Sequence, residues 1–228
     1  MELLQLREKK IFETLKSLKG ADFVIIGGYA VNTYTLPRFS VDCDIVVRDK
    51  KALKKIMRIL KQNDYAELKD QKAELPYKGE FLKFKKEIKK DFYVSTDILF
   101  KKVLDRQTNA VFSADWIFKN SEIRRLKGKT ISEELKIRII NIDALFVMKL
   151  ISCRSTDIRE LFMIGPCVKN KAWIKDEVSK HADLKERLGK VKKKILSKQF
   201  QDGLQGVFGM INPDIFDKHK KEILSFED

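Results

Sequence analysis

The sequence predicts an α/β (α+β) chain, with a mixed β-sheet and flanking helices over residues 1–140 and a helical part over residues 141–228. Two patterns support the first part. Apolar residues recur at helical spacing in two segments, and short apolar or alternating runs typical of strands follow each of them. From about residue 142 only helical periodicity remains. No internal repeat or low-complexity linker marks the boundary, so we expect the two parts to pack closely.

In chain order, the first part is predicted to alternate helices and strands. Residues 3–18 place apolar side chains on one helical face, and Gly20 ends that helix. An apolar run that ends at Gly27-Gly28 predicts a buried strand and a turn, and Pro37 stops the short helix that follows. The other predicted elements are a strand over 41–47, a helix over 50–65, strands over 79–88 and 91–100, and further strands within 121–140.

The longer helices have a clear inward face. The helix over 50–65 is expected to bury an apolar stripe. In the second part, strong helical patterns cover 141–153 and 156–164, and a Lys-rich helix is expected over 183–200 with a solvated basic face. The stripe of the helix over 50–65 consists of Leu53, Ile56, Met57 and Leu60.

The charge of the chain narrows the class of partner without naming a reaction. Lysine and arginine number 48 against 33 acidic residues, which gives a net charge of +15 and a pI near 9.6. Such a field attracts polyanions such as RNA and nucleotides. Lysines spread over a solvated surface explain the same charge, so charge alone leaves both interpretations open.

Cysteines, histidines and apolar runs exclude several classes of protein. Three cysteines without C-x-x-C spacing favour reduced thiols over a disulfide framework or a zinc site. Two histidines leave few candidates for histidine-dependent catalysis. No apolar run is long enough to cross a bilayer, and the charged N-terminus does not fit a secretory signal. We therefore expect a cytoplasmic protein with no membrane partner.

Asp42 and Asp44 are the strongest local feature of the sequence. On a strand, residues i and i+2 share a face, so the two carboxylates lie within several ångströms of each other. They repel unless a cation lies between them, and hard oxygen ligands of this kind suit Mg²⁺. Alone, such a pair is more often two solvated acids at a strand end.

Gly27 and Gly28 change that interpretation. A glycine pair between a strand and a helix lets backbone N–H groups approach an anion, and the helix N-terminus adds positive potential. If the two flanking strands pair, this phosphate-holding loop faces the carboxylates of Asp42 and Asp44. That is the geometry of metal-assisted phosphoryl or nucleotidyl transfer.

The stretch "IGGYAVNTYTLPRFSVDCDIVV" resembles the signature of the DNA polymerase β-like nucleotidyltransferase superfamily. Its G-G-x-A … R-x-S-x-D-x-D form is most similar to the AbiEii and MenT toxin branch. That branch carries a second signature, a helix with a lysine followed shortly by an aspartate that opens another helix. The stretch "DALFVMKLISCRSTDIREL" fits it, with Lys149 and Asp157 in those positions.

The resemblance implies a role for each residue of the first motif. Asp42 and Asp44 would hold two divalent ions, Mg²⁺ or Mn²⁺, between the attacking and leaving oxygens. Gly27, Gly28 and the N–H of Tyr29 would hold the terminal phosphates of an NTP.

Arg38 and Ser40 would hydrogen-bond phosphate or sugar, the arginine with its forked geometry. Lys149 would place a point charge on the triphosphate, and Asp157 would belong to the same nucleotide site. Each of the last two also has a plainer interpretation. Lys149 is then one more lysine on an amphipathic helix, and Asp157 is a helix N-cap with Glu160 completing a capping box.

Members of this superfamily use a third carboxylate on a neighbouring strand, and Asp97 is the best candidate. It lies mid-strand among apolar neighbours, where a charge without a function would be costly. It would share one metal ion and help to deprotonate the attacking hydroxyl. Asp91 and Asp105, at the ends of the same segment, remain alternatives.

The sequence therefore predicts a nucleotidyltransferase-like fold in which a catalytic domain, 1–140, is closed by a helical domain, 141–228. The enzyme would transfer a nucleoside monophosphate from an NTP to a hydroxyl acceptor and release pyrophosphate. The basic charge favours RNA such as a tRNA 3′ end, with a protein side chain or a small molecule as alternatives, and the resemblance adds an antitoxin as a partner to consider. The competing class is a non-catalytic module of the same fold that binds RNA or protein.

Overall fold

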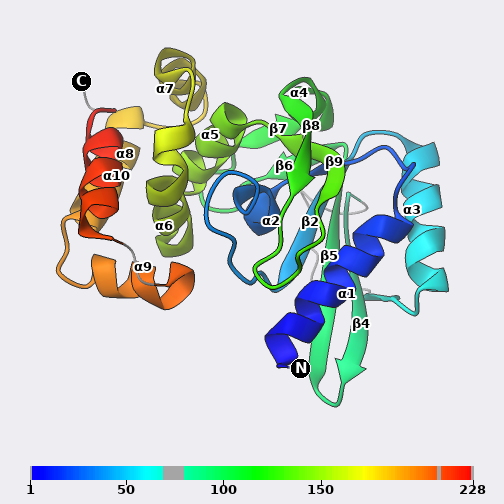
Figure 1. The fold of residues 1–228 in the computed structure, drawn as a ribbon. Coiled ribbons are helices and arrows are strands. Elements are labelled where there is room, and N and C mark those ends of the chain that lie inside the picture. Colours follow the sequence, from blue (N-terminus) through cyan, green and yellow to red (C-terminus); the bar gives the residue numbers. More distant parts are fainter. Residues whose placement is uncertain (1, 69–79, 210–211, 227–228) are drawn as a thin grey trace. The chain divides into compact units, whose positions relative to one another are not determined.

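The computed structural model describes residues 2–68, 80–209 and 212–226 (Figure 1). The chain divides into two compact units, with the principal division between residues 140 and 141. Unit 1 consists of residues 1–33, 39–104 and 111–140, and unit 2 of residues 34–38, 105–110 and 141–228.

Unit 1 combines short helices with a run of strands. Its helices are α1 (Leu3–Ser17), α2 (Gly27–Val31), α3 (Lys50–Gln62) and α4 (Ala114–Lys119). Its strands are β1 (Val24–Ile25), β2 (Asp42–Val47), β3 (Ala66–Leu68), β4 (Phe81–Lys89), β5 (Phe92–Phe100), β6 (Lys102–Leu104), β7 (Val111–Ser113), β8 (Ser121–Leu126) and β9 (Leu135–Ile140).

These strands form a seven-stranded mixed sheet with the order β3-β4-β5-β2-β1-β9-β8, and β6 pairs with β7 in a separate hairpin. β2 runs parallel to β5 and β1 runs parallel to β9, whereas the other neighbours are antiparallel. The predicted α/β class, a mixed sheet with flanking helices, is confirmed.

The central strand β2 buries apolar side chains on one face of the sheet and carries two aspartates on the other. Cys43, Ile45 and Val47 are at most 1% exposed. Because side chains alternate along a strand, Asp42 and Asp44 lie on the opposite face. Helix α1 packs against β5 (Figure 1). Burial of the apolar face thus holds the strand in a register that presents both aspartates together.

Helix α1 is tied to the turn between β8 and β9 by a buried carboxylate. Glu8 accepts hydrogen bonds from the backbone N–H groups of Lys129 at 2.6 Å and Thr130 at 2.8 Å. The hydroxyls of Thr14 and Tyr65 lie 2.7 Å apart on another side of the helix. A buried carboxylate needs such partners, so these bonds hold α1 beside the β8–β9 hairpin.

Helix α3 is shorter and less deeply buried than its pattern predicts. Ile56 and Leu60 are fully buried, as expected. Leu53 and Met57 are only half-buried, since they lie at the margin of the apolar stripe. The helix ends at Gln62 rather than residue 65.

In the described part of residues 141–228, unit 2 contains helices and no strand, as predicted. In α5 nearly every residue is buried, and the side chain of Asn141 caps its start by accepting the N–H of Ala144 at 2.9 Å. Phe146 stacks on Phe226 with ring centroids 4.7 Å apart. The helices of the unit are α5 (Ile142–Ser152), α6 (Ser155–Ile164), the 3₁₀ turn η2 (Gly165–Cys167), α7 (Lys171–Ser179), α8 (Leu184–Ile195), α9 (Phe200–Phe208) and α10 (Pro213–Leu224).

Short elements account for most differences from the predicted pattern. Strands β3, β6 and β7 have three residues each, too few for a period to show. The predicted helix over 183–200 is interrupted after Ile195, and α9 starts at Phe200. Gly79, the first residue of the predicted strand over 79–88, lies outside the described residues.

Within the described ranges, no helix combines the length and apolar character needed to cross a membrane.

Candidate active site

Three carboxylates lie on one face of the adjacent strands β2 and β5. Asp42 and Asp44 are two residues apart on β2, and Asp97 lies directly opposite Asp44 in the parallel pairing with β5. Paired residues share a face of the sheet, and neighbouring strands are about 4.8 Å apart. The register therefore brings the third predicted carboxylate beside the first two.

The glycine turn lies against one of these carboxylates. Gly27 is the first residue of α2 and has φ +66°, a left-handed conformation that favours glycine. A Cβ built on Gly27 would overlap the carboxylate of Asp44. Glycine is therefore required here by both the backbone and the close approach of Asp44. The predicted turn and the predicted acidic pair face each other.

Lys83 and Ser95 complete the cluster, and neither was predicted from the sequence. Lys83 lies on β4 opposite Asp97, and its Nζ is 3.4 Å from Asp42 Oδ1 and 3.4 Å from the Asp97 carboxylate. Ser95 lies opposite Asp42 and donates its hydroxyl to Asp42 Oδ1. The only sequence signal for Lys83 is the alternation of its strand.

The pKa values in the cluster are shifted first by burial and then by the neighbouring charges. Burial raises the pKa of Asp97 to about 6; the ammonium of Lys83 opposes that rise and the charge of Asp42 adds to it. Burial lowers the pKa of Lys83, but Asp97 and Asp42 raise it more, so the net shift is upward. Burial and the neighbouring Asp44 raise the pKa of the Cys43 thiol, which keeps it protonated.

The chemical type of the donor atoms in the cluster suits a divalent cation. Carboxylate oxygens are the ligands that Mg²⁺ and Mn²⁺ prefer. The buried Oδ1 of Asp97 accepts no hydrogen bond from any described residue. As the side chains stand, however, no three His, Cys, Asp or Glu residues in the described ranges enclose a metal position. The ammonium of Lys83 lies between Asp42 and Asp97 instead, where it balances part of their charge.

The alternatives to Asp97 have other environments. Asp91 is exposed in the turn between β4 and β5, with φ +59°. Of the two candidates in unit 1, only Asp97 faces Asp44. Asp105 belongs to unit 2, where its carboxylate accepts hydrogen bonds from the Ser152 hydroxyl and from the N–H of Thr108 at 2.9 Å. Burial raises the pKa of Asp105, but these hydrogen bonds outweigh it and lower the net value.

Lys149 and Asp157 meet in unit 2 in a buried ionic network. Lys149 Nζ is 2.8 Å from Asp157 Oδ1 and 2.5 Å from Glu160 Oε2. Arg38 donates from Nε to Glu160 Oε1 at 2.9 Å. Burial lowers the pKa of Lys149, but Glu160 and Asp157 raise it more, so the ammonium stays charged. Lys149 is therefore not a solvated lysine on a helix face.

Asp157 is not the N-cap of its helix. Arg154 occupies the N-cap position of α6, and Asp157, three residues on, accepts its backbone N–H at 3.2 Å and its Nε at 2.7 Å. Burial raises the pKa of Asp157, but Lys149 and Arg154 lower it by more than burial raises it, so the net shift of the pKa is downward. The capping box with Glu160 is wrong, because Glu160 bonds Lys149 and Arg38 instead.

The remaining predicted nucleotide contacts lie near the glycine turn in the chain. Ser40 donates its hydroxyl to the carbonyl oxygen of Asp42 at 3.2 Å, and Tyr29 is buried in α2 with its ring 6.5 Å from that of Phe12. The predicted residues thus form two groups, each within one unit. Unit 1 holds Gly27, Gly28, Tyr29, Ser40, Asp42, Asp44 and Asp97, and unit 2 holds Arg38, Lys149 and Asp157.

Comparison with solved structures shows which fold this is. The chain is similar to MenT4, a nucleotidyltransferase toxin from Mycobacterium tuberculosis, with a TM-score of 0.58 and 11% identity over 98% of this chain and 83% of that one. It is also similar to an antigenic nucleotidyltransferase-like protein from Paracoccidioides brasiliensis, with a TM-score of 0.50 and 14% identity over 95% and 97% of the two chains. JHP933 from Helicobacter pylori aligns with a TM-score of 0.48 and 16% identity over 99% and 90%. No protein-family model and no curated protein matches the sequence.

The chain has the nucleotidyltransferase fold. The resemblance carried by the two sequence motifs is confirmed at this level. Similarity at such low identity establishes the fold alone, so the reaction has to be argued from the side chains of the site.

Proposed function

We propose that this protein is a metal-dependent nucleotidyltransferase. It transfers a nucleoside monophosphate from an NTP to a hydroxyl acceptor and releases pyrophosphate. The observation that carries the proposal is the meeting of Asp42, Asp44 and Asp97 on one face of β2 and β5, with Asp44 against the Gly27 turn. The nucleotidyltransferase fold supports the same reaction.

The carboxylates of Asp42, Asp44 and Asp97 would hold Mg²⁺ or Mn²⁺, which when bound neutralises phosphate charge and polarises the P–O bonds. Asp97, with its pKa raised to about 6, accepts the proton of the attacking hydroxyl. The acceptor oxygen then bonds to the α-phosphorus. The bond from that phosphorus to the bridging oxygen breaks, and pyrophosphate leaves with the electron pair.

The glycine turn supplies the phosphate contacts in this proposal. The N–H groups of Gly27, Gly28 and Tyr29 lie in the first turn of α2, the end of a helix that favours a bound anion. Ser40 is the remaining nucleotide contact proposed in unit 1, through its hydroxyl. Its hydrogen bond to the backbone of the acidic strand orients that hydroxyl.

In unit 2, Lys149 and Arg38 are proposed to contact the triphosphate, and Asp157 to orient Lys149. The network supports a positioning role, because two carboxylates hold the ammonium at 2.5 and 2.8 Å. Those carboxylates also neutralise it. A phosphate contact therefore requires Lys149 to exchange one of its two ion pairs.

The acceptor favoured here is RNA, such as a tRNA 3′ end. The net charge of +15 supports a polyanionic acceptor, and the likeness to MenT4, described as a nucleotidyltransferase toxin, supports a toxin-like role in which an antitoxin is a partner. A protein side chain is the second acceptor class. We keep cytoplasmic location as part of the same proposal.

One observation favours the alternative, a non-catalytic module that binds RNA or protein. Lys83 supplies a cation to the carboxylate cluster from within the chain. A site that balances its own charge has less need of a metal ion. Mg²⁺-dependent binding of NTP separates the two functions, because a site balanced by lysine alone would bind NTP weakly and without Mg²⁺.

The test is label transfer from each α-labelled NTP in the presence of Mg²⁺, total tRNA and total protein. We expect label in one class of acceptor, and its loss in Asp44→Asn. Asp64→Asn is the matched control, because Asp64 is an exposed acid of unit 1 outside the cluster. Transfer that persists in Asp44→Asn would overturn the site. If no label reaches any acceptor and the protein binds RNA equally well with and without Mg²⁺, the non-catalytic binding module is favoured.

A further inference from the structure

One lysine of unit 1 lies inside the acidic cluster. Lys83 Nζ is 3.4 Å from Asp42 Oδ1 and 3.4 Å from the carboxylate of Asp97, so one ammonium contacts carboxylates of two strands, β2 and β5. The side chain of Lys83 is 32% exposed and that of Asp97 is 13% exposed. Water screens charges less where they are partly buried, so this attraction is stronger than one between surface charges. The chain therefore supplies a cation of its own to the cluster.

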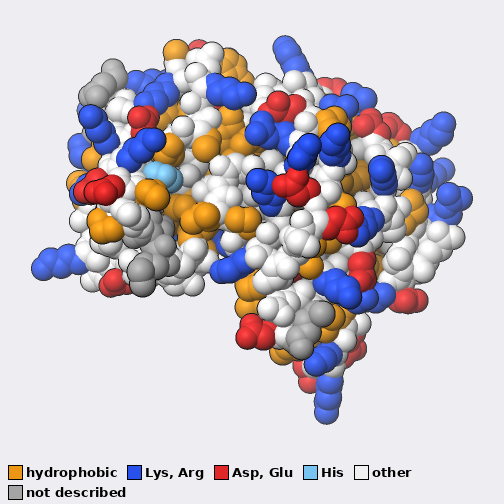
Figure 2. Space-filling model, in the orientation of Figure 1, with side chains coloured by type: hydrophobic (Ala, Val, Ile, Leu, Met, Phe, Trp, Pro, Cys, Tyr) orange, Lys and Arg blue, Asp and Glu red, His pale blue; other side chains and the backbone are white. Residues whose placement is uncertain are grey.

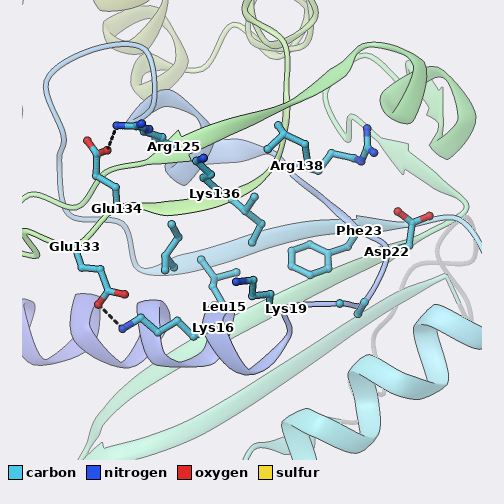
Figure 3. A pocket seen from close by; sticks show the side chains of 15 residues that line it. Leu15, Lys16, Lys19, Asp22, Phe23, Arg125, Glu133, Glu134, Lys136 and Arg138 are labelled. Carbon is cyan, nitrogen blue, oxygen red and sulfur yellow. Dashed lines mark hydrogen bonds and ion pairs between the residues drawn. The ribbon is translucent and has the colours of Figure 1, made fainter.

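A lysine-rich surface does not account for this contact. Figure 2 shows Lys and Arg side chains scattered over the visible face of the molecule. At the hollow between α1 and the β8–β9 hairpin, each paired cation takes one carboxylate: Lys16 pairs with Glu133, and Arg125 pairs with Glu134 at 3.3 Å (Figure 3). These four side chains are between 36% and 66% exposed, and such exposed pairs contribute little to stability. Lys83 differs because it is less exposed and contacts two carboxylates.

The ammonium of Lys83 occupies the position from which a metal ion would bridge Asp42 and Asp97. It lies 3.4 Å from both carboxylates, and Mg²⁺ binds oxygens at about 2.0–2.1 Å, so the two cations would use the same gap. Oδ1 of Asp42 also accepts the hydroxyl of Ser95. Two cations in one gap repel each other strongly. The gap is therefore available to Lys83 or to a metal ion, but not to both.

The order of the strands puts Lys83 and the glycine turn on opposite sides of the carboxylates. In the order β4-β5-β2-β1, the aspartates lie on the two middle strands, and Lys83 reaches them from β4. The Gly27 turn follows β1 on the other side, and Asp44 lies against it. A metal ion that contacts the phosphates held by this turn therefore belongs beside Asp44, away from the ammonium.

The charge of the cluster suits one divalent ion. When ionised, Asp42, Asp44 and Asp97 carry three negative charges, which one ammonium and one divalent ion balance in full. A second divalent ion beside Lys83 would add positive charge where water screens it poorly. The charge of a bound NTP would offset it only in part, because the phosphates lie on the side of the glycine turn.

We infer that this site holds a single divalent ion, beside Asp44, and that Lys83 takes the place of the second ion of a two-metal site. The inference rests on the proposed nucleotidyl transfer. In two-metal sites the ions stabilise the attacking and the leaving oxygens. Lys83 lies beside Asp97, the proposed acceptor of the hydroxyl proton, so its ammonium stabilises the attacking oxygen as that proton leaves.

The test counts bound Mn²⁺ by electron paramagnetic resonance, with an NTP analogue that has a methylene group between its α- and β-phosphorus atoms. Two Mn²⁺ ions about 3.5–4 Å apart give a spin-coupled spectrum, and a single ion gives an uncoupled one. We expect one uncoupled ion per wild-type chain and a coupled pair in Lys83→Met. Lys83→Arg keeps the charge and should keep the single ion. Lys85→Met is the matched control and should stay uncoupled, because Lys85 lies opposite Ser95 on the same strand with its Nζ over the ring of Tyr93.

A coupled pair in the wild type would overturn the inference and leave the proposed function intact, because a two-metal site performs the same transfer. A single ion in Lys83→Met would also overturn it, since the lysine would then not be what excludes the second ion. Thermal melting shows whether Lys83→Met is folded, and the wild-type spectrum decides alone if it is not. A wild type that binds no Mn²⁺ in the presence of the analogue would contradict the proposed function itself.

Discussion

Gly27→Ala is the substitution that most directly perturbs the contact between the glycine turn and the acidic strand. The backbone of Gly27 has φ +66°, and a Cβ there would overlap the carboxylate of Asp44. The overlap is relieved only if Asp44 or the turn moves. Either movement separates the proposed phosphate site from the proposed metal ligands.

The size of the effect on stability follows from the backbone. A left-handed alanine costs roughly 1–2 kcal/mol, and for a chain of this length each kcal/mol lowers Tm by about 2–4 °C. Strain alone should therefore lower Tm by about 2–8 °C. Gly20→Ala is the matched control, because Gly20 has φ +87° but its Cβ would meet only Lys55 Nζ, at 3.7 Å.

The assay is calorimetric titration with NTP in the presence of Mg²⁺, alongside thermal melting. We expect both variants to lose stability, and only Gly27→Ala to lose NTP affinity. The loss should be at least about tenfold, which corresponds to about 1.4 kcal/mol. A folded Gly27→Ala variant that binds NTP like the wild type would refute the reasoning, since Asp44 would then be free to move without consequence.

Three further predictions concern the ionic clusters. Lys149→Met should cost about 3–5 kcal/mol of unfolding free energy in urea, because it removes the buried cation that the carboxylates of Asp157 and Glu160 share. Arg154→Met, with a side chain 57% exposed, should cost no more than about 1 kcal/mol. Similar losses would contradict the buried network. Lys83→Met should strengthen Mn²⁺ binding, measured by electron paramagnetic resonance, by about tenfold or more, because the substitution removes the ammonium that competes with the metal for Asp42 and Asp97. Lys85→Met is the control and should leave Mn²⁺ binding unchanged. Weaker binding in Lys83→Met would show that the lysine supports the metal. Mn²⁺ affinity should fall about tenfold from pH 7 to pH 5, because Asp97 with a pKa of about 6 takes up a proton as pH falls and the metal needs the ionised form; a flat profile would exclude Asp97 as a ligand.

Local spacing is sufficient to predict the motif residues of unit 1. Two aspartates at i and i+2 share a face on any strand, so the pairing of Asp42 with Asp44 needs no tertiary information. A strand that ends in two glycines before a helix likewise predicts the turn at Gly27. The position of Asp97 opposite Asp44 depends on a parallel register that no local pattern encodes.

Lys83 could not be predicted because its position depends on a β-bulge. At the turn end of the β4–β5 hairpin, Lys89 pairs with Phe92, and that register continued would place Phe84 opposite Asp97. The irregularity just before Lys89 shifts the pairing by one residue and places Lys83 there instead. A one-residue shift exchanges the two faces of a strand, so the cation appears in the cluster only once the bulge is known.

The ionic network in unit 2 shows a different limit of prediction from the sequence. The spacing of Lys149 and Asp157 is visible in the sequence, and their contact at 2.8 Å follows from two adjacent helices. Arg38 and Glu160, which complete the network, are 122 residues apart in the chain. Contacts at such separation leave no local pattern, so the sequence leaves a solvated lysine open as an alternative where the structure has a buried one.

The central claim is that Asp42, Asp44 and Asp97 direct attack at the α-phosphorus of an NTP. The most direct measurement compares the fate of α-label and γ-label from the same NTP in parallel reactions of the wild type and Asp44→Asn. We expect α-label on the acceptor, γ-label in pyrophosphate, and loss of both in Asp44→Asn. Transfer of the γ-label to the acceptor, or α-label transfer that survives in Asp44→Asn, would contradict it.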